Sequence, residues 1–178
     1  YRRIHPRLGD WEHIEQLAED YRLMFDFVAN HISKSSDWFQ KYLQGDPTYE
    51  RYFIQRDPSF DTSQVIRPRT TPLFHDYPGT NNTKTVWTTF SEDQIDLNYR
   101  HFPVLLEMTD ILLEYAYKHG TSIRLDAIGF IWKESGTTCM HLPQAHAIIQ
   151  LWRLLLDYFK PNTQIITETN VPHHENIS

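Results

Sequence analysis

Apolar residues recur at helical spacing in three stretches of the chain. Asp10, a residue type that favours helix N-caps, precedes the first stretch, and the other two stretches begin at Pro103 and Pro143. A glycine ends the second stretch and a proline ends the third. The pattern therefore predicts three helices: one after Asp10 that runs to Tyr21, one from Pro103 up to Gly120, and one from Pro143 up to Pro161.

Three compact apolar runs alternate with these helices. They are "RLMFDFVANH" at 22–31, "TSIRLDAIGF" at 121–130 and "QIITETN" at 164–170. The length and composition of the first run suit a strand that is buried on both faces. Strands that alternate with helices indicate a parallel sheet with right-handed crossovers, but three strands cannot close it. We expect the α/β class, as part of a TIM (β/α)8 barrel covering about strands 3 to 5.

Residues 32–99 differ from this regular pattern. Five prolines and two glycines interrupt them, a short helical turn is predicted around Trp38–Leu43, and "KTVWTTF" at 84–90 predicts one strand. A structureless loop of this length is improbable. The predicted organisation is a barrel segment over 1–31, an inserted subdomain, domain B, over 32–99 and a second barrel segment over 100–178, with the rest of the barrel absent from this chain.

Composition excludes several classes of protein. The chain has 178 residues, a formal charge of −6 and 40% hydrophobic residues, which indicate a globular domain without a basic face for nucleic acid or anionic lipid. No apolar run approaches the roughly 20 residues that a membrane span needs. The single cysteine, Cys139, cannot form an internal disulfide, which favours a reducing cytoplasm.

Charged residues at the strand ends suggest chemistry. Arg124 and Asp126 lie two positions apart, so their side chains point to the same side of a strand, where a guanidinium can keep a carboxylate ionised. Glu168 lies on the next strand, and the apolar neighbours Ile166 and Val171 are expected to raise its pKa. An ionised and a protonated carboxyl on adjacent strands suit retaining glycosyl transfer, which needs them about 5 to 5.5 Å apart.

Each of these residues also has a purely structural interpretation. Arg124 and Asp126 fit equally well a buried ion pair that only holds the sheet together. Glu168 fits a solvated strand end, and His31 fits a histidine that caps a helix or lies in the core. Residue types and spacing leave these alternatives open.

Four motifs, in order, resemble the conserved segments of the α-amylase family, glycoside hydrolase family thirteen. They are "DFVANH" at 26–31, "QIDLN" at 94–98, "IRLDAIG" at 123–129 and "ITETN" at 166–170. Within the family, "VWTTFSEDQIDLN", "RPR" at 67–69 and "KESGTTCMHLPQAH" at 133–146 are most similar to the sucrose phosphorylase branch, which includes enzymes acting on glucosylglycerate, glucosylglycerol or sucrose 6'-phosphate.

The resemblance implies roles for individual residues. Asp126 corresponds to the nucleophile, Glu168 to the general acid/base and Arg124 to the residue that orients the nucleophile. His31 corresponds to a histidine that hydrogen-bonds the glucose ring, and Asp26 to a structural aspartate beneath it.

Further positions match the branch in the inserted segment. Phe90 corresponds to an aromatic platform for the sugar, and Gln94 to a glutamine on the acceptor side. Arg67 and Arg69 are candidates for bidentate contact with phosphate, although arginines in such a loop are also common as plain surface residues. Asn30 matches a calcium ligand of many amylases. The branch is generally metal-free and no acidic cluster completes such a site, so we expect no metal and no other cofactor.

The resemblance implies phosphorolysis of sucrose or a related α-glucoside to α-glucose 1-phosphate, with a small sugar and inorganic phosphate as partners. The alternatives are a hydrolase or transglucosylase of the same family and a catalytically silent fragment. The family's fourth segment, which carries a histidine and an aspartate, is missing. We therefore expect the isolated chain to be inactive; either the full enzyme is longer, or this fragment survives by self-association.

Overall fold

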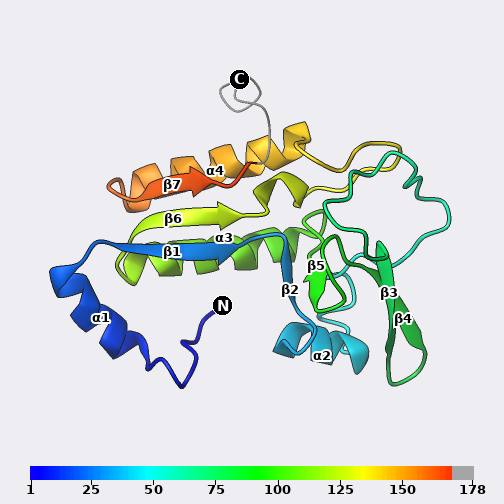
Figure 1. The fold of residues 1–178 in the computed structure, drawn as a ribbon, viewed down its shortest axis with the longest axis horizontal. Helices are drawn as coiled ribbons and strands as arrows, with labels where there is room; N and C mark the ends of the chain where they lie inside the picture. The colour runs from blue at the N-terminus through cyan, green and yellow to red at the C-terminus, as the bar shows by residue number, and fades with distance from the viewer. Residues whose placement is uncertain (170–178) are drawn as a thin grey trace.

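The computed structural model describes residues 1–169 of the chain. A parallel sheet at its centre holds β1 (Leu23–Val28), β6 (Gly120–Asp126) and β7 (Gln164–Thr167), in the order β1-β6-β7 (Figure 1). β1 and β6 are each followed along the chain by a segment that leads to a helix, α3 and α4 respectively. The sequence pattern predicted this alternation, and the parallel pairing of neighbouring strands is confirmed.

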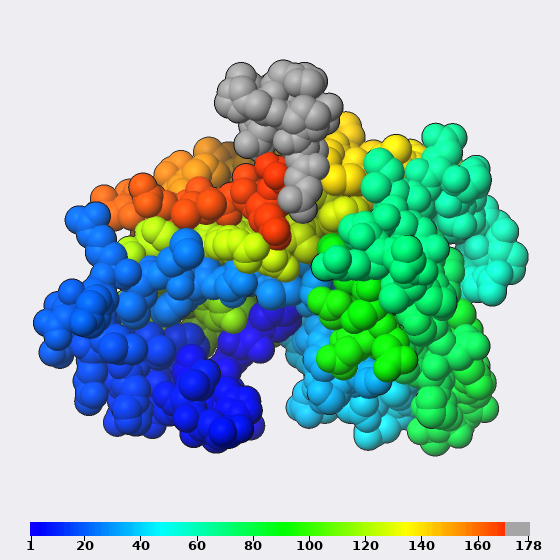
Figure 2. All heavy atoms as spheres, viewed as in Figure 1, coloured from blue at the N-terminus to red at the C-terminus, as the bar shows by residue number. Residues whose placement is uncertain are grey.

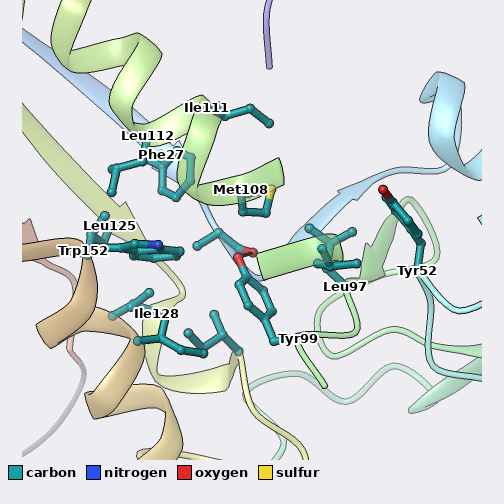
Figure 3. Packing of buried hydrophobic residues seen from close by; sticks show 14 of the residues in the cluster. Phe27, Tyr52, Leu97, Tyr99, Met108, Ile111, Leu112, Leu125, Ile128 and Trp152 are labelled. Atoms are coloured by element: carbon teal, nitrogen blue, oxygen red, sulfur yellow. Dashed lines mark hydrogen bonds between the residues drawn. The ribbon is translucent and has the colours of Figure 1, made fainter. Parts of the chain in front are cut away.

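Two long helices cover one face of this sheet. They are α3 (Phe102–Tyr117) and α4 (Pro143–Phe159), and each begins with a proline in its first turn, where the missing N–H leaves no bond unmade. Phe27, Leu125 and Trp152 meet beneath them and are fully buried (Figure 3). The Trp152 ring lies edge-on to Phe27, and its Nε1–H donates a 2.8 Å hydrogen bond to Thr109 on α3.

The opposite face of the sheet is open. In Figure 2 the strands run across the visible surface of the molecule. Alternate residues of β1 point to this face, and Met24 is 58% exposed. The expectation that the run at 22–31 forms a strand buried on both faces is therefore wrong, because helices pack against one side of the sheet only in the described residues.

The first helix, α1 (Trp11–Asp20), begins as predicted. The carboxylate of Asp10 accepts hydrogen bonds from the backbone N–H groups of Glu12 and His13, which satisfies two donors that a helix start leaves free. The helix contains no buried residue, and its apolar stripe touches the sheet mainly through Trp11, whose ring contacts Phe25 edge-on.

Residues 31–96 form smaller elements beyond the carboxyl ends of the central strands (Figure 1). The helix α2 (Asp37–Leu43) matches the predicted helical turn. β2 (His31–Ser33) pairs with β5 (Gln94–Asp96), and β3 (Phe74–Pro78) forms a hairpin with β4 (Thr83–Trp87). The sequence pattern predicted only β4, as 84–90, because β2, β3 and β5 are short and lack an alternating apolar pattern.

All three predicted strands end earlier than expected. The run at 22–31 divides into β1 and β2, and the run at 121–130 ends at Asp126. Ala127 then adopts a left-handed backbone conformation with φ 53°, and a short 3-10 turn, η1, covers Ile128–Phe130. The predicted strand at 164–170 extends to Thr167, and residue 170 lies outside the described residues.

One hydrophobic core includes residues of the central sheet and its helices and residues of the segment 31–96. The buried cluster around α3 continues from Phe27 and Met108 through Leu97 and Phe53 to Val86 on β4 (Figure 3). The division into barrel segments and an inserted subdomain at residues 31 and 99 stays a prediction, since one core spans the proposed boundary. No helix of residues 1–169 is both long and apolar enough to cross a membrane.

Candidate active site

One arginine contacts three carboxylates at the open face of the sheet. The Arg124 Nη1 atom lies 2.6 Å from Asp26 Oδ1 and 3.1 Å from Asp126 Oδ1, and its Nη2 atom lies 3.0 Å from Glu168 Oε2. The ion pair of Arg124 with Asp126, which the two-residue spacing predicts, is present. The shortest contact of Arg124 is nevertheless with Asp26 on the neighbouring strand.

The parallel register brings these groups together. Arg124 pairs with Asp26 across β1 and β6, so both side chains stand on the same face of the sheet. Asp126 lies two residues further along β6 and shares that face. The Glu168 backbone N–H donates to Leu125 O at 3.1 Å, which holds Glu168 beside the end of β6 although β7 stops one residue earlier.

Burial, reinforced by the nearby Glu168 carboxyl, raises the pKa of Asp126 to about 6. A hydrogen bond from Asp126, together with the positive charge of Arg124, lowers the pKa of Glu168. The two carboxyls are hydrogen-bonded to each other and so titrate as a pair.

These directions are opposite to the prediction from the sequence, which placed the raised pKa on Glu168. The predicted cause was an apolar setting beside Ile166 and Val171. Ile166 is 45% exposed because β7 lies at the edge of the sheet, and Val171 lies outside the described residues. Glu168 is consequently more solvated than Asp126, which explains why the proton of the pair favours Asp126.

A cavity of about 390 Å³ opens beside the two carboxyls. Six of the predicted site residues line it: His31, Arg69, Phe90, Gln94, Asp126 and Glu168. Arg124 and Asp26 do not line the cavity. Arg124 contacts Asp126 and Glu168, which do, and Asp26 contacts Arg124. Arg67 does not line this cavity.

His31, Gln94 and Phe90 form one wall of the cavity. The Gln94 amide N–H donates to His31 Nε2 at 2.9 Å, and Ser91 Oγ donates to the Gln94 carbonyl oxygen at 2.7 Å, which fixes the orientation of the amide. Burial lowers the pKa of His31, so the ring is neutral at pH 7 and its Nε2 can accept. Phe90 stands 5.2 Å from His31 between ring centroids and offers an apolar face.

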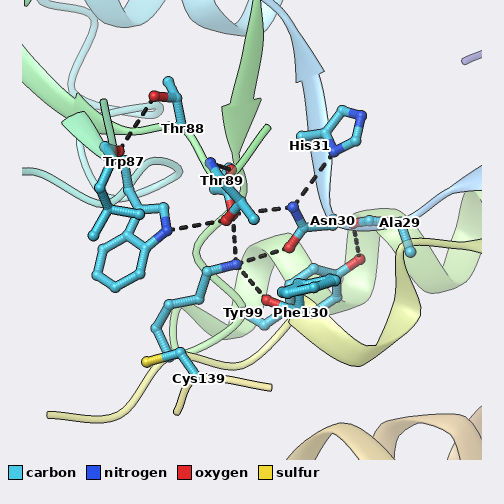
Figure 4. Close-up of polar contacts among 12 residues, drawn as sticks. Ala29, Asn30, His31, Trp87, Thr88, Thr89, Tyr99, Phe130 and Cys139 are labelled. Carbon is cyan, nitrogen blue, oxygen red and sulfur yellow. Dashed lines mark hydrogen bonds and ion pairs between the residues drawn. The ribbon is translucent and has the colours of Figure 1, made fainter. Parts of the chain in front are cut away.

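A buried lysine, Lys133, binds Asn30, which lies beside His31 of this wall (Figure 4). The side chain of Lys133 is 3% exposed, and its ammonium lies 2.6 Å from the fully buried carboxylate of Asp96. The same ammonium donates to Asn30 Oδ1 at 2.7 Å and to the carbonyl of Phe130. Asp96 also accepts from Thr89 N–H and Oγ–H, at 2.8 and 2.6 Å.

The Lys133 contacts change the interpretation of Asn30. The amide oxygen that would serve a calcium ion accepts a hydrogen bond from an ammonium group of the chain itself. Among residues 1–169, no group of three His, Cys, Asp or Glu side chains is arranged to hold a metal ion.

Three residues of the site had no role predicted from the sequence. Lys133 carries the buried charge, and Phe130 and His141 line the cavity. A single lysine within the apolar stretch "GFIWKE" was a signal for the first, because a lysine is rarely buried without a partner. His141 had no comparable signal in a polar loop.

A family model described as alpha amylase, catalytic domain, matches residues 1–178. The chain belongs to the α-amylase family. Over all 178 residues it is 51% identical to a glucosylglycerate phosphorylase of Spirochaeta thermophila, covering 30% of that protein. It is 30% identical over 156 residues to a sucrose phosphorylase of Agrobacterium vitis, with 82% of this chain and 32% of that protein covered. The chain thus spans about a third of the length of these curated relatives.

The fold has a close counterpart among solved structures. The sucrose 6F-phosphate phosphorylase from Thermoanaerobacter thermosaccharolyticum superimposes with a TM-score of 0.87, at 24% sequence identity, over 99% of this chain and 39% of that one. This likeness supports the fold, and the expectation of a partial barrel of this family is confirmed. The three strands of the α-amylase family chain form an open sheet, as predicted.

We predict that Lys133→Met lowers the free energy of unfolding by about 3 to 5 kcal/mol, because it leaves the buried Asp96 carboxylate without its counter-charge. Urea denaturation measures the effect. The matched control is Lys34→Met, which removes an exposed ion pair with Glu92 and should cost less than about 1 kcal/mol. Equal losses in the two variants would contradict the assignment of Lys133 as a structural charge.

We predict that Glu168→Gln lowers the pKa of Asp126 from about 6 towards 3.8, because a negative neighbour is removed while Arg124 remains. A raised carboxyl pKa stabilises the folded protein below pH 3.8, and this contribution is lost as the pH rises through about 6. The loss should therefore shrink in the variant. Carbon NMR titration of the carboxyl groups measures the Asp126 midpoint, and urea denaturation below and above that midpoint measures the loss of stability, with the exposed Glu12→Gln as control. An unchanged Asp126 midpoint would show that the carboxyls titrate independently.

Proposed function

We propose that this chain carries part of the catalytic centre of a retaining phosphorylase that releases α-glucose 1-phosphate from an α-glucoside. The observation that supports it best is the contact of one guanidinium with both Asp126 and Glu168, at the wall of a cavity of sugar size. Because Arg124 contacts both groups, the carboxyls face the same space and can act on one sugar carbon.

The proposed reaction is a double displacement. An Asp126 oxygen bonds to the anomeric carbon while the glycosidic C–O bond breaks, and the proton of Glu168 goes to the leaving oxygen. Glu168 then accepts a proton from phosphate, whose oxygen replaces Asp126 on the same carbon. Two inversions give α-glucose 1-phosphate with net retention.

This chemistry requires the shared proton on Glu168, the reverse of its favoured place in the ligand-free pair. A sugar seated between the two carboxyls breaks their hydrogen bond and shields Glu168 from water, which raises its pKa. Arg124 remains in contact with Asp126 and stabilises the ionised nucleophile. The proposed roles of Asp126 and Glu168 therefore depend on substrate binding.

The neighbouring side chains suit a glucosyl group. His31 and Gln94 offer polar atoms for sugar hydroxyls, and Phe90 offers an apolar face for the C–H groups of the ring. Asp26 holds Arg124 in place without lining the cavity, as the role of a structural aspartate requires. For phosphate we propose Arg69, which lines the cavity, ahead of Arg67, which does not.

We infer glucosylglycerate as the preferred substrate class, ahead of sucrose. The support is the identity of 51% over the whole chain to a protein named glucosylglycerate phosphorylase, against 30% over a shorter stretch for one named sucrose phosphorylase.

The single cysteine, buried and unpaired, suits the reducing cytoplasm that we propose as the location.

The proposal is tested by product analysis of the full-length protein with glucosylglycerate and with sucrose, each with and without phosphate. We expect phosphate-dependent formation of α-glucose 1-phosphate, faster from glucosylglycerate. Release of free glucose at the same rate without phosphate would identify a hydrolase, and transfer to a second sugar would identify a transglucosylase. No turnover in any arm would favour a silent member of the family.

We predict that Asp126→Asn reduces turnover by at least about 10⁴-fold, because the amide cannot form the glucosyl ester. Initial rates of glucose 1-phosphate release measure the loss. Asp157→Asn, which alters an exposed ion pair with Arg153 on α4, should keep the rate within about twofold. Undiminished turnover in the Asp126 variant would refute its role as nucleophile.

A further inference from the structure

Strained backbone gathers at one side of the cavity. Four described residues other than glycine have positive φ angles, and three of them follow β6: Ala127 at 53°, Cys139 at 51° and His141 at 52°. Ala127 and His141 both line the cavity. Such conformations persist where surrounding contacts enforce them, and they are common at ligand sites.

Close contacts with Gly129 place the His141 ring. The His141 backbone N–H donates to the Gly129 carbonyl at 2.8 Å. A Cβ atom at position 129 would lie 2.5 Å from Cε1 and 2.9 Å from Nδ1 of His141, so only glycine leaves room for the imidazole. The ring therefore rests on the backbone just after the Asp126 strand, at the wall of the cavity.

The loop that carries His141 is bonded to the segment that carries Arg69. Ile66 N–H donates to Thr138 O at 3.0 Å, and Gly136 N–H donates to Asp61 O at 2.9 Å. Ile66 and Arg69 line the same cavity as His141. These backbone bonds hold the segment that carries Arg69 beside the loop that carries His141, although the two are far apart in sequence.

Arg69 makes no hydrogen bond or ion pair with any other side chain among residues 1–169. A guanidinium left unpaired at a cavity wall is available to an anion. The reacting carboxyls, Asp126 and Glu168, are paired with Arg124 and repel an anionic ligand. An anionic acceptor therefore needs both a cation and a second donor on this side of the cavity.

We propose that His141, together with Arg69, selects acceptors that carry a carboxylate. The imidazole N–H donates to one carboxylate oxygen of a small hydroxy acid while Arg69 pairs with its charge. The hydroxyl of the acid then faces the anomeric carbon at Asp126. This inference rests on the proposed glucosyl transfer, and it adds the residue that distinguishes an acid from a neutral acceptor.

The test is the synthetic direction of the reaction in the full-length protein, with α-glucose 1-phosphate as donor. Glycerate and glycerol serve as acceptors, because they differ in the carboxylate. His141→Ala should raise the KM for glycerate about 10-fold to 100-fold, the usual effect of losing a hydrogen bond to a charged group, and change the KM for glycerol less than about twofold. His146→Ala, on an exposed position of α4, is the matched control.

Two further variants address folding. His141→Gln keeps an N–H donor and should recover part of the affinity for glycerate, whereas Gly129→Ala displaces the imidazole and should reproduce the loss. Thermal melting identifies variants that unfold. An unchanged ratio of glycerate to glycerol KM in the folded His141 variants would overturn the inference and leave the proposed function standing. If the unaltered protein makes no glucoside with either acceptor, the proposed function fails and the inference fails with it.

Discussion

The buried ion pair of Lys133 and Asp96 is the contact on which the rest of the site depends. Lys133 follows β6, Asp96 ends β5, and Asn30 follows β1, so three segments separated by 66 and 103 residues meet at one ammonium. A charge removed from water is tolerated only when its partners are in place. The pair therefore requires the segment from 31 to 96 to dock against the sheet in one way, with every polar atom of Asp96 satisfied.

The docking has a direct consequence for the cavity. His31 follows Asn30 and Gln94 precedes Asp96 by two residues, so two side chains that line the cavity are neighbours of the two that bind Lys133. The wall of the cavity is thus fixed by contacts behind it and does not rely on a ligand. On the other side, backbone bonds between the loops of Ile66 and Thr138 hold the segment carrying Arg69.

The open face of the sheet works differently. There, a single guanidinium contacts three carboxyls, and burial together with the Glu168 carboxyl raises the pKa of Asp126, while the hydrogen bond from Asp126 lowers that of Glu168. Such a pair responds to whatever covers it, because burial and loss of water change the two pKa values unequally. The exposure of β7 at the sheet edge explains why the proton of the pair favours Asp126 over Glu168. Contacts behind the cavity wall therefore hold it in place, whereas the pKa values of Asp126 and Glu168 respond to what covers these two carboxyls.

The sequence by itself determined the parts of this protein that depend on local spacing. The alternation of helices and strands, the Asp10 cap and the common face of Arg124 and Asp126 follow from periods of 3.6 and 2 residues. Only the tertiary structure decided which distant groups meet: Lys133 with Asp96, Arg124 more closely with Asp26 than with Asp126, and Arg69 rather than Arg67 at the cavity. It also reversed the expected pKa shifts, since desolvation depends on what covers a side chain, which no local pattern of residues records.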